Sequence, residues 1–154
     1  MPTAGEPAHA AGHLLTVRAR DLDRFVGIPY CLRSMDCADL VLKVQAELFG
    51  RNVMLPGARP RPLRSEAQWP ALRAHVDMLA WRVDEPADGD LVLMINAGET
   101  QAGHAGTFFW LDHQGWVLHT SQTLGASVLH RAASLPSMGL HVEGWYRWGA
   151  SAHE

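Results

Sequence analysis

A cysteine and two histidines occupy positions in this chain where they could act together as a nucleophile, a base and an orienting group. Cys37 follows Asp36 at the start of an apolar-striped segment, and His104 and His119 lie later, on strand-like segments. A thiol attacks a carbonyl carbon as its thiolate, an adjacent imidazole removes its proton, and a third group orients that imidazole. The order of these residues therefore indicates thiol-based hydrolysis with two imidazoles.

The local sequence around Cys37 favours a reactive thiol. Asp36 is a good helix N-cap, and Gly50 is a natural residue after a helix end, so the sequence predicts a helix over 37–49. The apolar residues between them form one stripe at helical spacing: Leu40, Val41, Val44 and Leu48. Unpaired N–H groups and the helix dipole at this end favour a thiolate, although the dipole contributes only about 0.3–1 kcal/mol. An imidazolium partner must therefore supply most of the activation; the alternative is that Cys37 is a small buried hydrophobic residue.

The two histidines are predicted to meet on neighbouring strands. His104 directly precedes a strand predicted over 105–111, and His119 lies near the end of a strand predicted over 116–120. Antiparallel pairing would set the rings side by side, with one nitrogen of His104 bound to His119 and the other facing Cys37. A larger turn near Asp112–Gly115 is expected between the two strands, in the interval that separates His104 from His119 in the sequence. Because the chain holds nine histidines, an ordinary solvated or hydrogen-bonded histidine is the alternative at each position.

Composition restricts the class of protein. A chain of 154 residues with 47% hydrophobic and 19% charged residues fits one domain with a real core. A formal charge of −3 gives no electrostatic case for nucleic acid as a partner.

Two cysteines six positions apart do not form a disulfide framework, and Cys31 is interpreted as structural or incidental. Residues 1–15 are expected to be disordered, with no signal peptide or membrane span, so synthesis in the cytoplasm is expected.

The order of predicted elements indicates an α+β fold. Short helices are expected over 16–26, 37–49 and within 65–81, with an extended Pro- and Arg-containing connector over 51–64. Strands are predicted over 91–95, 105–111, 116–120, 127–131 and 142–148. Helices first and strands later favour N-terminal helices packed on a mostly antiparallel sheet of about five strands, in a single domain over 16–149.

Five short motifs follow one another along the chain: Pro29-Tyr30, Asp36-Cys37-Ala38-Asp39-Leu40-Val41, Gly89-Asp90-Leu91-Val92, His104-Ala105-Gly106 and His119. These motifs resemble those of the NlpC/P60 cysteine peptidases, which have a papain-like core. That family shows Asp-Cys-Ser-Gly-Leu-Val, Gly-Asp-Leu-Val and His-Val-Gly at the second, third and fourth of these places. The resemblance covers about residues 20–148 and is greatest to the phage and prophage tail branch.

The resemblance implies a role for each matched residue. Cys37 would be the nucleophile, His104 the general base and His119 the orienting third residue. Tyr30 would line the site and help to bind substrate, and Asp36 would help to hold the free amine of a stem peptide. The family commonly cleaves the γ-D-glutamyl–diaminopimelate link of bacterial cell-wall peptides and needs no cofactor. A tail-associated protein would act in the periplasm after delivery by the tail, with tail proteins as partners.

The chain also departs from the family pattern. Ala38 replaces a serine, Asp39 replaces a glycine, and Arg33-Ser34-Met35 replaces a Gly-rich stretch. Arg33 would contact substrate carboxylates or remain a solvated loop charge. These departures leave two other functions open, a tail-assembly protein with weak or lost hydrolase activity and a thiol acyltransferase or amidase acting on a non-wall substrate. Zinc held by Cys37, His104 and His119 is disfavoured, because none of these residues belongs to a close ligand pair.

Overall fold

An antiparallel sheet of six strands organises the computed structural model, which describes residues 16–54, 70, 73–74 and 76–149. The strand order across the sheet is β1-β6-β2-β3-β4-β5, and every neighbouring pair is antiparallel. The strands are β1 (Ala80–Val83), β2 (Leu91–Asn96), β3 (His104–Leu111), β4 (Gln114–His119), β5 (Val128–Arg131) and β6 (Leu140–Trp148). The helices are η1 (Ala19–Phe25), α2 (Cys37–Phe49), η2 (Ala132–Ser134) and η3 (Pro136–Met138), where η denotes a 3₁₀ helix.

The α+β class and the antiparallel sheet are confirmed, and the five predicted strands are present with ends that differ by at most two residues. The helix predicted within 65–81 is present in the described part of that range. The described residues 70, 73, 74 and 76–79 are helical, but Ala80 begins a sixth strand that pairs with β6. The predicted helix over 16–26 is the shorter 3₁₀ helix η1. The predictions for 1–15 and 55–69 lie outside the described residues.

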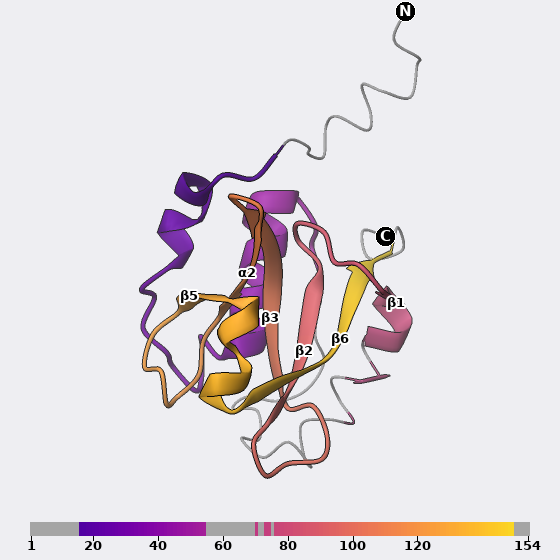
Figure 1. Cartoon of the computed structure of the whole chain (residues 1–154). Coiled ribbons are helices and arrows are strands. Elements are labelled where there is room, and N and C mark those ends of the chain that lie inside the picture. The colour runs from indigo at the N-terminus through magenta and orange to yellow at the C-terminus, as the bar shows by residue number, and fades with distance from the viewer. Residues whose placement is uncertain (1–15, 55–69, 71–72, 75, 150–154) are drawn as a thin grey trace, which may run out of the picture.

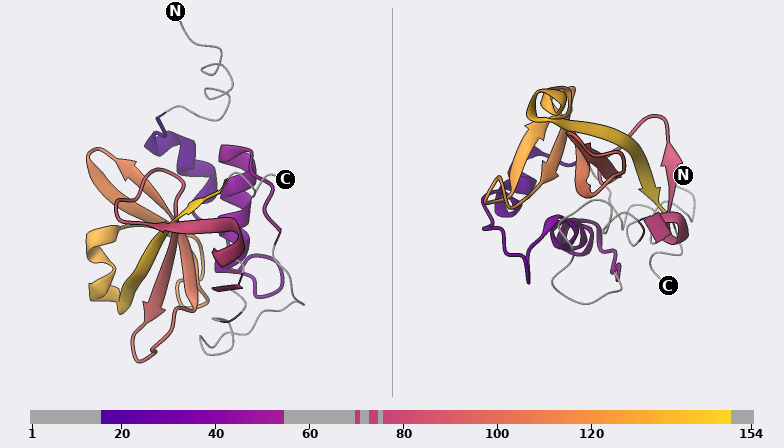
Figure 2. Two further views of the ribbon diagram at one scale, coloured as in Figure 1. Left: turned by 90° about the vertical axis from the view of Figure 1, so that its right-hand side faces the viewer. Right: turned by 90° about the horizontal axis from the view of Figure 1, so that it is seen from below.

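The two faces of the sheet are covered differently (Figures 1 and 2). The helix α2 lies along one face, where Leu40 and Val44 pack with Phe109 and Leu118. The short helices η2 and η3 lie toward the other side, where Leu135 packs against Val92, Met94, Phe108 and Val117. Strand alternation explains this division, because successive side chains point to opposite faces. The centre of the sheet is therefore buried on both faces, in agreement with the near-continuous burial of β2 and β3.

The Gly89-Asp90 motif launches β2 and has a structural explanation. Gly89 has a φ of +91°, and a Cβ atom there would lie 2.7 Å from the ring of Phe49. The buried Asp90 accepts hydrogen bonds from the Ala87 N–H at 2.8 Å and from the Arg147 guanidinium at 2.9 and 3.2 Å. The motif therefore fixes a turn and ties β2 to β6, as expected for a turn that starts a strand.

The turn between β3 and β4 is tighter than expected. Leu111 pairs with Gln114, so only Asp112 and His113 form the turn, with φ values of 55° and 64°. Two consecutive positive φ values are typical of a type I′ hairpin turn, whose twist matches that of the flanking strands. The prediction of a larger turn is therefore wrong. Residues of β3 and β4 themselves account for most of the sequence interval between His104 and His119.

Replacing His113 by glycine is expected to stabilise the protein by about 0.5–1 kcal/mol, because glycine adopts a positive φ without strain and Asp-Gly is a favoured I′ pair. Urea unfolding measures the change. His113→Ala removes the ring but keeps the Cβ atom, so it is not expected to stabilise. Equal stabilisation by both variants would contradict this explanation.

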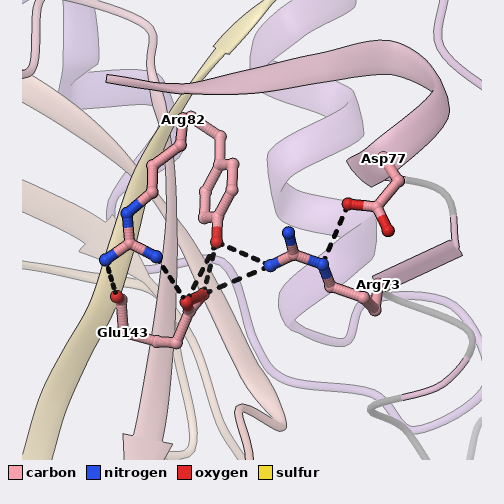
Figure 3. A network of polar contacts seen from close by, with 5 residues as sticks. Arg73, Asp77, Arg82 and Glu143 are labelled. Atoms are coloured by element: carbon pink, nitrogen blue, oxygen red, sulfur yellow. Dashed lines mark hydrogen bonds and ion pairs between the residues drawn. The ribbon is translucent and has the colours of Figure 1, made fainter. Parts of the chain in front are cut away.

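A polar network joins the helical residues before β1 to β6 (Figure 3). The register between β2 and β6 shifts so that Leu93 pairs with Gly144 and Met94 with Val142, which leaves Glu143 as an extra residue on β6. Glu143 accepts from Arg82 at 2.9 Å and from the Tyr146 hydroxyl at 2.6 Å. Arg73 donates to the same hydroxyl at 2.8 Å. Because Arg73 also pairs with Asp77 at 2.9 Å, the network ties the helical residues to the sheet.

Tyr146→Phe is expected to destabilise the protein by about 2 kcal/mol, because a buried hydroxyl bound to a charged carboxylate and a guanidinium is lost. Urea unfolding at neutral pH measures the change. Phenylalanine keeps the ring between the guanidinium groups of Arg73 and Arg82, so the measurement isolates the hydroxyl. A change below about 0.5 kcal/mol, the range of ordinary surface substitutions, would contradict the importance of this network.

Candidate active site

The start of α2 is fixed by a reciprocal pair of capping hydrogen bonds. The Asp39 N–H donates to the Asp36 carboxylate at 2.9 Å, and the Asp36 N–H donates to the Asp39 carboxylate at 2.9 Å. This is a capping box with aspartate in place of the usual Glu or Gln at its third helical position. Asp39, which departs from the family pattern, therefore contributes to the helix end that carries Cys37. Ala38 is buried at 4% exposure.

Cys37 and His104 line the same cavity, which has a volume of about 280 Å³. Cys37 is 8% exposed and packs with core residues such as Val41, yet it still contributes to the cavity wall. The wall is mostly polar and is formed by residues from α2, the loops on either side of the β3–β4 hairpin and the loop before α2. These residues are Tyr30, Asp36, Cys37, Asn96, Glu99, Gly103, His104, Thr120, Ser121, Gln122 and Thr123.

Three histidines form a row across β3, β4 and β5. His104 Nε2 lies 2.8 Å from His119 Nδ1, and His119 Nε2 lies 2.9 Å from His130 Nδ1. Strand register explains the row: Gly106 pairs with His119 and Val117 with His130, so the three imidazoles share one face of the sheet. Neighbouring ring centroids are 5.1 Å apart in both contacts.

Gly106 allows the strands to approach at this point. A Cβ atom on Gly106 would lie 2.7 Å from Val117 Cγ1 and 2.9 Å from the Leu118 carbonyl oxygen. It would also lie 3.2 Å from the Cβ of His119, so a larger residue would displace the histidine pair. The glycine of the His-Ala-Gly motif therefore has a packing reason that is directly linked to the site.

Burial keeps the histidine row neutral at pH 7. Desolvation lowers the pKa of His104 from 6.5 to about 4. Desolvation, followed by the proximity of His104 and His130, lowers the pKa of His119 to about 3. Desolvation also lowers the pKa of the half-buried His130. His104 is therefore a neutral imidazole near pH 7, which can remove a proton from a thiol during attack, in place of the resting imidazolium expected from the sequence.

The structure groups most, but not all, of the site residues predicted from the sequence. Tyr30, Asp36, Cys37 and His104 line the cavity. His119 is not among the lining residues but contacts His104. Arg33 lies in the exposed turn that precedes α2 and is not among the lining residues. The other cysteine, Cys31, is exposed in this turn, and hydrogen bonding to Ser34 lowers its pKa.

Sequence reasoning missed His130 and the polar residues from the loops after β2 and β4. His130 lies on a strand that was predicted, but the loop between β4 and β5 leaves the register open, so its pairing with Val117 has no sequence signal. Glu99 and Thr120 follow strand ends in the sequence, which is a position typical of site residues.

No family model, curated protein or solved structure matches this chain. Within the described ranges, no helix has the length and apolar character needed to cross a membrane. The same residues contain no group of three His, Cys, Asp or Glu side chains arranged to hold a metal ion.

Proposed function

We propose that this protein is a cysteine peptidase or amidase of the NlpC/P60 type, with a papain-like core, that hydrolyses peptide links in bacterial peptidoglycan stem peptides. The observation that carries the proposal is that Cys37, at a capped helix start, shares a polar cavity with His104, whose ring is held by His119. A nucleophile, a base and an orienting group are the parts that thiol-based acyl transfer requires. The motif order described above supports the family and the substrate class.

The proposed reaction begins with transfer of the thiol proton from Cys37 to the free nitrogen of His104. The sulfur then attacks the carbonyl carbon of the scissile amide, and backbone N–H groups at the start of α2 hold the oxyanion. His104 returns the proton to the leaving amine as the C–N bond breaks, which leaves a thioester on Cys37. Water, deprotonated by His104, attacks the thioester and releases the carboxylic acid and the thiol.

The chemistry of the cavity wall supports a substrate that carries an ammonium group. Two carboxylates, from Asp36 and Glu99, line the cavity, whereas no Lys or Arg belongs to its described lining. The buried Thr120 hydroxyl also lines it and has no hydrogen-bond partner among the described residues. A stem peptide offers free amino groups to the carboxylates and amide groups to the hydroxyl. Delivery by a phage tail, which the resemblance implies, stays a prediction.

The test is incubation of the whole protein with purified peptidoglycan and with a tetrapeptide stem, followed by mass spectrometry of the products and quantification of new amino groups. Release of stem fragments that stops after alkylation with iodoacetamide is expected. The alkylation is carried out on the Cys31→Ser variant, because the exposed Cys31 thiol has a lowered pKa and would also react with iodoacetamide. Absence of cleavage, or cleavage insensitive to alkylation, would overturn the proposal.

A further inference from the structure

The row of three histidines continues beyond the base and its orienting partner. His119 uses both ring nitrogens, Nδ1 toward His104 and Nε2 toward His130. A neutral imidazole carries one proton, so one nitrogen of each ring donates and the other accepts. With one proton in each contact, all three rings must therefore point their N–H bonds in the same direction along the row.

The two possible directions have opposite consequences for His104. If each Nε2 carries the proton, His104 donates to His119, His119 donates to His130, and the lone pair of His104 Nδ1 is available as a base. If each Nδ1 carries the proton, His104 holds a hydrogen at Nδ1 and accepts from His119, so it cannot remove a proton. The direction of the row therefore determines whether His104 can be a base.

We propose that His130 is a positioning residue that fixes the working direction by accepting the Nε2–H of His119 at its own Nδ1, 2.9 Å away. His119 is 1% exposed, and a buried N–H without an acceptor is costlier than an unused lone pair. Without His130, His119 would move its proton to Nδ1, where His104 Nε2 can accept it. His104 would then hold its own proton at Nδ1. The catalytic consequence, though not the tautomer itself, rests on the proposed function.

Two matched variants separate this role from packing. His130→Phe keeps a ring in the half-buried position but removes the acceptor. His130→Asn places its side-chain oxygen near the position of Nδ1 and restores an acceptor. We expect His130→Phe to lower kcat for stem-peptide hydrolysis at least about tenfold, the factor that one ordinary hydrogen bond corresponds to, with KM changed less than twofold. His130→Asn is expected to retain kcat within about threefold of the wild-type value.

The tautomer is read directly from ¹⁵N NMR of the histidine rings in the full-length protein at pH 7.5, without substrate. His119 is expected to carry its proton on Nε2 in the wild type and in His130→Asn, and on Nδ1 in His130→Phe. A wild-type His119 protonated on Nδ1, or a tautomer unchanged in His130→Phe, would overturn the inference whether or not the protein hydrolyses peptidoglycan. Unchanged kcat in a folded His130→Phe variant of an active enzyme would overturn it as well. A correct tautomer in a protein that cleaves no wall peptide would instead contradict the proposed function alone.

Discussion

Replacing Cys37 by alanine is expected to lower the rate of stem-peptide hydrolysis by at least about 10³-fold, because the sulfur that forms the thioester is removed and the covalent route is lost. The histidines and the cavity wall stay in place, so substrate binding is expected to change little. The rate of release of new amino groups from a tetrapeptide stem, followed at saturating substrate, measures the effect. Alanine has nearly the size of cysteine, so the 8% exposed position is expected to tolerate it.

Cys31→Ala is the matched control for this experiment. It removes the second thiol of the chain from an exposed turn that does not line the cavity. Its hydrolysis rate is expected to equal that of the wild type, whereas the double variant is expected to behave as Cys37→Ala does. Equal product release by the wild type and a folded Cys37→Ala variant would exclude Cys37 as the nucleophile.

The protein is expected to lose stability as the pH falls below about 6.5, because two buried imidazoles resist protonation. In the unfolded chain each titrates near the ordinary pKa of 6.5, whereas the folded-state pKa is about 4 for His104 and about 3 for His119. Between these values the unfolded state binds more protons, so the free energy of unfolding rises with pH across the window. The stability present above pH 6.5 is therefore lost as the pH falls through the folded-state pKa, and His104 alone accounts for about 3 kcal/mol of that loss.

Urea unfolding at intervals from pH 7 to pH 4 measures this loss. His104→Gln is the control, because the amide keeps a hydrogen-bond donor for His119 but does not titrate. Its free energy of unfolding is expected to fall less steeply with decreasing pH than that of the wild type. The difference between the two slopes is expected to correspond to at most one proton bound on unfolding. The comparison of slopes is independent of any general destabilisation by the substitution. Parallel curves for the two proteins between pH 6.5 and 4 would contradict a neutral buried imidazole at this position.

Local patterns made much of the fold predictable. Asp36 and Gly50 mark the ends of α2 because capping depends on neighbouring residues alone, and the structure has the helix at Cys37–Phe49. Strand β1 was not predicted, because Ala80–Val83 is short and its pairing with Trp148 and its neighbours is long-range. The Asp112–His113 turn is tighter than predicted, and its two positive φ values have little sequence signal because neither residue is a glycine.

The site was predictable only as far as side-chain chemistry and strand order allow. The residue types of Cys37 and His104 indicate chemistry, and the hairpin that joins β3 to β4 brings His119 beside His104. Which residues of the loops after β2 and β4 line the cavity depends on how these loops close in three dimensions, so the strand-end positions of Glu99 and Thr120 did not by themselves identify them as lining residues. Arg33 stood next to the motif in sequence, but the turn that holds it leaves it exposed and outside the cavity lining.

The β3–β4 hairpin has one further practical consequence. His104 begins β3 and His119 ends β4, whereas the tight turn joins the opposite ends of these strands. At the rise of an extended chain, the tip lies about 20 Å from the imidazole pair. A fluorophore or surface linker attached at position 113 would therefore report on the protein, or immobilise it, without entering the cavity.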